Sequence, residues 1–114
     1  MTPINAPTVG ASSPWGVIQQ ATRFVRDGQT IAISVSTAGH GGFWAAPHLR
    51  TGMAAIETAY SHGGWFEEDC DWALANVGLD LGPIDPERDL TEAALRSLKV
   101  YHPEQFAALS DPAA

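Results

Sequence analysis

The sequence is poor in cysteine and has no long apolar run. Cys70 is its single cysteine, which excludes an internal disulfide and an all-cysteine zinc site. No apolar stretch approaches the ~18 residues that a membrane-spanning helix needs. Residues 1–13 contain no Lys or Arg and no compact apolar block, and a secretory signal requires both. These absences predict a cytoplasmic protein without a membrane-spanning segment.

Basic residues are also scarce, and their distribution is uneven. Six Lys and Arg residues face thirteen Asp and Glu residues, which gives a net charge of −7. Twelve of the acidic residues lie in residues 57–114, which carry a charge of −9, whereas residues 1–56 carry +2. Direct binding to nucleic acid needs clustered positive charge and is not expected. A negative surface favours basic protein partners, although it can also serve only to keep a small protein in solution.

The chain has the apolar content of a single globular domain, because 45% of its residues are hydrophobic. Residues 1–14 are rich in Pro, Ala, Ser and Thr and are predicted to form a flexible arm, followed by one domain at residues 15–110. Residues 17–25 and 30–36 read as strands joined by a turn, and residues 43–44 as a further short strand.

Helical patterns dominate the rest of the chain. The expected helices cover residues 47–60, 67–77, 90–101 and 103–109. The helix at 67–77 would carry acidic residues in its first turn, where they complement the helix dipole. The predicted fold is therefore α+β, with a small antiparallel sheet (an N-terminal hairpin plus a short strand) packed by two to three C-terminal helices.

A short sequence pattern occurs twice between the predicted N-terminal hairpin and the predicted helix at 67–77. Residues 40–44 read H-G-G-F-W and residues 62–66 read H-G-G-W-F. In the structural interpretation, two similar loop junctions are anchored in the core by their aromatic residues. In the functional alternative, His40, His62 and a carboxylate among residues 67–71 form the site of a small hydrolase or metal-dependent enzyme. The metalloprotease motif H-E-x-x-H and the esterase motif G-x-S-x-G are both absent, so no metal or cofactor is predicted.

Cys70 is the only soft nucleophile of the chain. A position near a helix start lowers the pKa of a thiol, but the neighbouring carboxylates disfavour the thiolate. Cys70 also shares an apolar stripe with Leu74 and Val77. The sequence therefore predicts a buried, unreactive thiol, and catalysis by Cys70 is the alternative.

Two clusters of acidic residues are the candidate contacts for a basic partner. Both clusters lie in the negative half of the chain, where exposed carboxylates attract Lys and Arg side chains. The candidate residues are Glu67, Glu68, Asp69, Asp71, Asp85, Glu87 and Asp89.

Three segments resemble the signatures of an uncharacterised small bacterial domain. Residues 36–43 resemble its pattern S-T-x-S-H-G-G-[FW], and residues 63–73 resemble G-G-W-[YF]-E-E-D-C-x-W. Residues 14–16 resemble its opening P-W-G. Gly39 departs from this pattern, which has serine at that position. The domain occurs in proteins of plasmids, phages and other mobile elements of proteobacteria, and the resemblance implies no particular activity.

Several anti-CRISPR proteins are similar to this chain in size and acidity, and they occupy the basic nucleic-acid channels of their targets. Together with the charge of −9 in residues 57–114 and the absence of a complete catalytic set, this similarity favours a non-catalytic inhibitor of a host nucleic-acid-binding defence complex. In that hypothesis the acidic surface competes with nucleic acid for a basic channel. The oligomeric state stays open.

Overall fold

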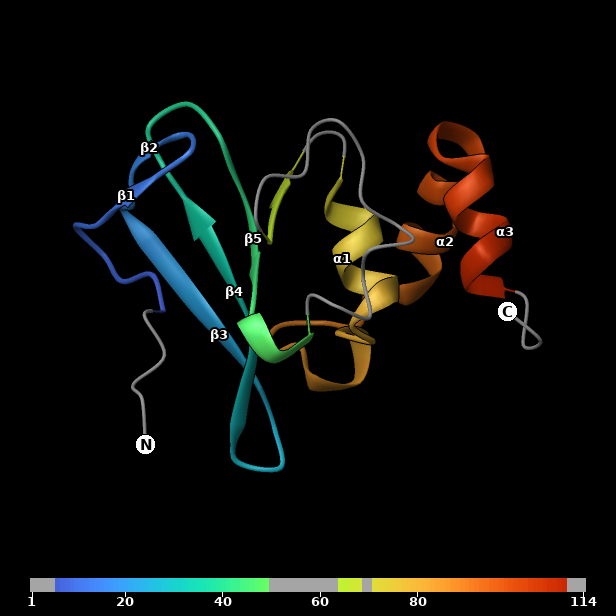
Figure 1. Cartoon of the computed structure of the whole chain (residues 1–114), viewed down its shortest axis with the longest axis horizontal. Helices are drawn as coiled ribbons and strands as arrows, with labels where there is room; N and C mark the ends of the chain where they lie inside the picture. The colour runs from blue at the N-terminus through green and yellow to red at the C-terminus, as the bar shows by residue number, and fades with distance from the viewer. Residues whose placement is uncertain (1–5, 50–63, 69–70, 111–114) are drawn as a thin grey trace.

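The structure, a computed structural model, describes residues 6–49, 64–68 and 71–110. It confirms the predicted α+β fold, with antiparallel strands followed by helices (Figure 1). The elements are β1 (Ser12–Ser13), β2 (Gly16–Val17), β3 (Gln20–Arg26), β4 (Gln29–Ser36), β5 (Gly41–Ala45), η1 (Pro47–Leu49), β6 (Trp65–Glu67), α1 (Trp72–Gly78), η3 (Gly82–Ile84), α2 (Thr91–Tyr101) and α3 (Pro103–Ser110).

In the described residues, the main sheet has four antiparallel strands in the order β3-β4-β5-β6. Its first hairpin is confirmed, since β3 pairs with β4 through a tight turn. Asp27 and Gly28 have φ angles of 52° and 78° there, the positive pair that matches the twist of a two-residue hairpin. The predicted strand at 17–25 is divided, because β2 ends at Val17 and β3 begins at Gln20.

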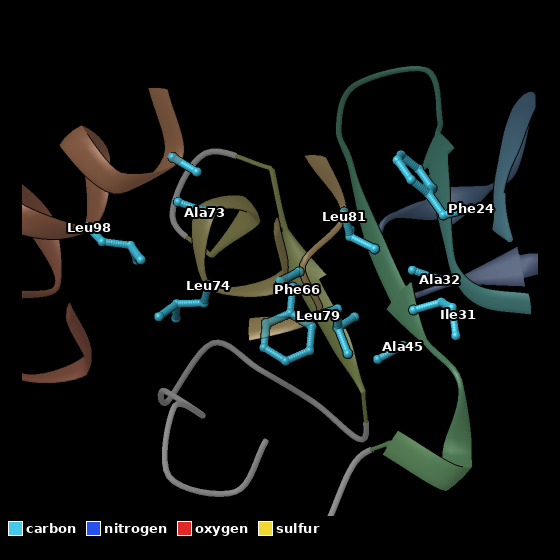
Figure 2. Packing of buried hydrophobic residues seen from close by; sticks show 12 residues of the cluster. Phe24, Ile31, Ala32, Ala45, Phe66, Ala73, Leu74, Leu79, Leu81 and Leu98 are labelled. Atoms are coloured by element: carbon cyan, nitrogen blue, oxygen red, sulfur yellow. The ribbon is translucent and has the colours of Figure 1, made fainter. Parts of the chain in front are cut away.

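One face of this sheet carries the larger hydrophobic core. Phe24, Ala32 and Ala45 from the strands meet Phe66 and residues of α1, α2 and the segment between them. Figure 2 shows Leu79 and Leu81, which follow α1, among these side chains, with Leu98 of α2 beyond α1. Truncating one of these large side chains loses the free energy gained by burying its apolar surface and also leaves a cavity with fewer packing contacts.

The opposite face is covered by the N-terminal segment. Trp15 packs against a second buried cluster, which is formed by Ile18, Ile33, Val35, Trp44 and Ala46. The ring of Trp15 also contacts the ring of Trp65 edge to face, with 5.5 Å between the ring centroids. The Gly10 N–H donates to the carbonyl of Ile18 at 2.9 Å, and β1 pairs with β2. Within residues 8–14 the backbone of Gly10, Ala11 and β1 is hydrogen-bonded, whereas most side chains, Val9 among them, are exposed.

The prediction of one helix over residues 67–77 was wrong. Residues 65–67 form β6, and the helix begins only at Trp72, so its first turn contains no acidic residue. Phe66 is 1% exposed opposite Phe43 in the sheet, and the Glu68 N–H donates to the carbonyl of Gly41 at 2.9 Å. Backbone pairing with β5 and burial of Phe66 outweigh the favourable placement of acidic residues at a helix start.

The helices gather on the β6 side of the sheet, where α1 packs against β5 and β6, α2 against α1, and α3 against both α1 and α2 (Figure 1). The predicted helices at 90–101 and 103–109 are confirmed by α2 and α3. Of the expected helix at 47–60, residues 47–49 form the short helix η1, and the remainder lies outside the described residues. None of the helices in the described part of the chain is long and apolar enough to cross a membrane.

Candidate functional site

The helix-side face of the sheet is apolar at one end of its strands and polar at the other. Strand pairing places Gln20 opposite Ser36 and Thr22 opposite Ser34, and Ser34 also pairs with Phe43. Because residues two apart on a strand share a face, these polar side chains line up beside the buried Phe24. The polar end of the face is the floor of a groove.

This groove, here called the sheet groove, is bounded by the segment between η3 and α2. Two hollows of about 250 and 470 Å³ share Ser34, Ser36, Phe43 and Leu90, so they form one continuous depression. The first hollow is also lined by Gln20, Thr22, Phe24, Asp85 and Glu87, and the second by Val35, Gly42, Glu68, Trp72, Arg88 and Ala93.

The acidic wall of the sheet groove is held by its own side chains. Oδ1 of Asp85 accepts hydrogen bonds from the backbone N–H groups of Glu87 at 2.8 Å and Arg88 at 3.2 Å. Oδ1 of Asp89 accepts from the hydroxyl and, at 2.9 Å, from the N–H of Thr91. These two hydrogen bonds lower the pKa of Asp89 from its usual 3.8, because both stabilise the charged carboxylate. The bond from the Thr91 hydroxyl has the larger effect and the bond from the Thr91 N–H the smaller. Asp85 and Asp89 thus shape the loop, and exposed Glu87 lies between them.

The structure separates the other acidic candidates. Glu68 is exposed and lines the sheet groove, whereas Glu67 is half-buried on β6. Asp71 precedes α1 and is fully buried, with its Oδ1 3.7 Å from Nε2 of His102. Burial removes Asp71 from the residues that can contact a partner in this conformation. Asp69 lies outside the described residues.

The three segments that carry the sequence resemblance meet at β5. The Thr37 hydroxyl donates to the carbonyl of His40 at 2.8 Å and lies 3.3 Å from the carbonyl oxygen of Trp15. A Cβ on Gly42 would lie 2.5 Å from the Trp15 ring, and one on Gly41 would lie 3.1 Å from Oε2 of Glu68. The glycines therefore let the N-terminal segment and β6 approach β5 closely.

The histidine site of the alternative hypothesis is only partly described. Nδ1 of His40, whose side chain is largely exposed, lies 3.9 Å from Oε1 of Glu67. His62 and Cys70 lie outside the described residues, so the predicted His40–His62 pair and the predicted burial of the thiol stay predictions. Within residues 6–49, 64–68 and 71–110, no three His, Cys, Asp or Glu side chains are arranged to hold a metal ion.

Sequence reasoning missed the hydroxyl floor of the sheet groove. Residues 31–36 alternate apolar and small side chains, and the small side includes Ser34 and Ser36. This alternation predicted the strand. The serines on its second face could also have indicated the groove, because polar side chains on the helix side of a sheet are typical of a surface that the helices do not fully cover. Placing Asp85 and Glu87 opposite these serines required the tertiary structure.

A comparison with protein families finds a match that spans most of the chain, including the N-terminal segment that covers the sheet. The match is to Domain of unknown function (DUF7007), over residues 8–114. No curated protein and no solved structure matches the chain. Since the matched region includes the sheet, the sheet groove and the helices α1, α2 and α3, this chain belongs to the DUF7007 family.

Proposed function

We propose that this protein is a non-catalytic interaction module whose acidic loop binds a basic surface of a partner protein. The observation that carries the proposal is the position of Asp85, Glu87 and Asp89 on one loop beside an open groove. Asp85 and Asp89 are held by hydrogen bonds to the loop itself, which presents the three charges in a defined arrangement. A preorganised charge pattern loses little conformational freedom on binding.

The charge of the chain favours a partner that itself binds nucleic acid. A net charge of −7, most of it in the second half, attracts a surface rich in Lys and Arg. A channel shaped for phosphates offers such residues, and carboxylates placed there form charge-assisted hydrogen bonds and exclude the nucleic acid. Inhibition of a host defence complex, in the manner of anti-CRISPR proteins, is the form of this proposal that the resemblance to mobile-element proteins favours.

The test compares two triple variants with the same net charge. In D85N/E87Q/D89N each side chain keeps an oxygen acceptor, so the hydrogen bonds of Asp85 and Asp89 can persist while three charges are removed. The control D27N/D80N/E104Q removes three exposed charges elsewhere, and asparagine tolerates the positive φ angles of residues 27 and 80.

Tagged protein would capture partners from host lysate at low and high salt, and the isolated partner would then be titrated with nucleic acid. We expect the loop variant to bind at least about tenfold more weakly than the control, since each charged contact contributes ~1.5–3 kcal/mol. We also expect added salt to slow association and nucleic acid to compete. Equal binding by the two variants, or a partner that binds nucleic acid undisturbed, would contradict the proposal.

A further inference from the structure

We infer that the sheet groove receives an arginine side chain of the bound partner. This inference rests on the proposed function and names the group that the groove recognises. It follows from the combination of negative charge, aromatic surface and hydroxyl acceptors around one depression, each supplied by a different element of the fold.

Charge is the first argument. Three carboxylates line the groove: Glu68, which follows β6, and Asp85 and Glu87 on the loop between η3 and α2. Among the described lining residues, Arg88 is the one cationic side chain. The excess of carboxylates attracts a cation and disfavours a phosphate or carboxylate ligand. These carboxylates supply acceptors for a cation that enters the groove.

Shape and chemistry distinguish arginine from lysine. Phe43 and Trp72 are half-buried and line the groove, so part of each side chain stays accessible. A guanidinium is planar, stacks on aromatic faces and is less strongly hydrated than an ammonium. It also carries five N–H donors in a fixed plane, which a single carboxylate cannot satisfy.

The hydroxyl floor supplies the remaining acceptors. Ser34 pairs with Thr22 across the two strands, and Ser36 follows Ser34 on the same face. These hydroxyls lie on strands, where their spacing is set by the sheet rather than by a mobile loop. With volumes of about 250 and 470 Å³, the two hollows are of the size that holds a side chain rather than a folded element.

The experiment uses two probes of equal charge, hexa-arginine and hexa-lysine peptides, titrated into the full chain by fluorescence anisotropy. We expect hexa-arginine to bind about tenfold more tightly, the effect of one additional charge-assisted hydrogen bond. Amide NMR shifts should change at Ser34, Ser36 and Phe43 and stay unchanged at Asp27 in the distant hairpin turn.

The variant E68Q/S36A should reduce the preference for arginine to about twofold or less, while the control E104Q/S97A, with the same changes on α2 and α3, should keep it. Thermal melts of both variants show whether the fold is retained, and the NMR shifts of the unmodified chain locate the bound peptide whatever the variants do. Equal affinity for the two peptides, or shifts confined to residues outside the groove, would overturn the inference.

The two proposals fail in different ways. If both peptides bind equally and D85N/E87Q/D89N weakens both, the acidic loop binds cations without arginine recognition, so the inference falls and the proposed function stands. If arginine is preferred at the groove but no partner is competed by nucleic acid, the groove chemistry stands and the proposed function falls.

Discussion

Replacing Gly42 with alanine tests how closely three segments pack together, namely the segments that resemble the domain signatures (residues 14–16, 36–43 and 63–73). A Cβ at this position would lie 2.5 Å from Cη2 and 3.0 Å from Cζ2 of Trp15, and closer still to the backbone carbonyl oxygen of Phe66. Ordinary contacts between carbon atoms lie at ~3.5–4.0 Å. The added methyl group must therefore displace either the Trp15 ring or the β6 backbone.

The expected loss exceeds that of an ordinary overpacking substitution. Inserting a methyl group into a packed core costs ~1–3 kcal/mol. Here the Phe66 carbonyl belongs to the backbone of a paired strand and cannot rotate away, and moving it disturbs the β5–β6 pairing that holds Phe66 in the core. We therefore expect a loss of about 3 kcal/mol or more, at or above the upper limit of that range.

The measurement is a thermal melt with a chemical unfolding curve. At ~4 °C per kcal/mol, Gly42→Ala should lower Tm by roughly 12 °C or more. Gly39→Ala is the matched control, because a Cβ there meets nothing within 4 Å and residue 39 has no positive φ. A Gly42→Ala melt within about 2 °C of the Gly39→Ala melt would refute the close packing of Trp15, β5 and β6.

Three further predictions concern the core and the acidic loop. Phe66→Ala should cost about 3–5 kcal/mol by chemical denaturation, because this ring is 1% exposed at the centre of the larger core; a loss below 1 kcal/mol would argue against its placement. The lowered pKa of Asp89 means that its contribution to stability is present above the usual value of 3.8 and is lost as pH falls through the lower folded value. The difference in Tm between the wild type and D89N should therefore be constant near neutral pH and become smaller under acid conditions. A difference that grows on acidification would contradict a lowered pKa for Asp89. Glu87→Lys should shift Tm by less than about 2 °C, since an exposed charge contributes little to stability, whereas Asp85→Lys should shift it further because it removes the acceptor for two backbone N–H groups.

Local sequence determined the elements whose signals lie within a few residues. The turn at Asp27 and Gly28 and the alternation of residues 30–36 specify the β3–β4 hairpin without distant contacts. The helical periodicity of α2 and α3, each bounded by a turn or a proline, likewise predicts both helices. Asp85, Glu87 and Asp89 lie on the loop that precedes α2.

Tertiary structure decided where local preference was ambiguous. Residues 65–68 combine two aromatic side chains suited to a strand with two acidic residues suited to a helix start, and pairing of residues 65–67 with β5 selects the strand. That choice exposes Glu68 at the groove, while the packing of the following helix buries Asp71 beside His102, although both residues belong to one acidic run in the sequence. Neighbouring carboxylates look alike in a sequence, and only the packing of distant segments determines which of them face solvent. The sheet groove arises in the same way, because its hydroxyl floor and acidic wall come from segments about 50 residues apart.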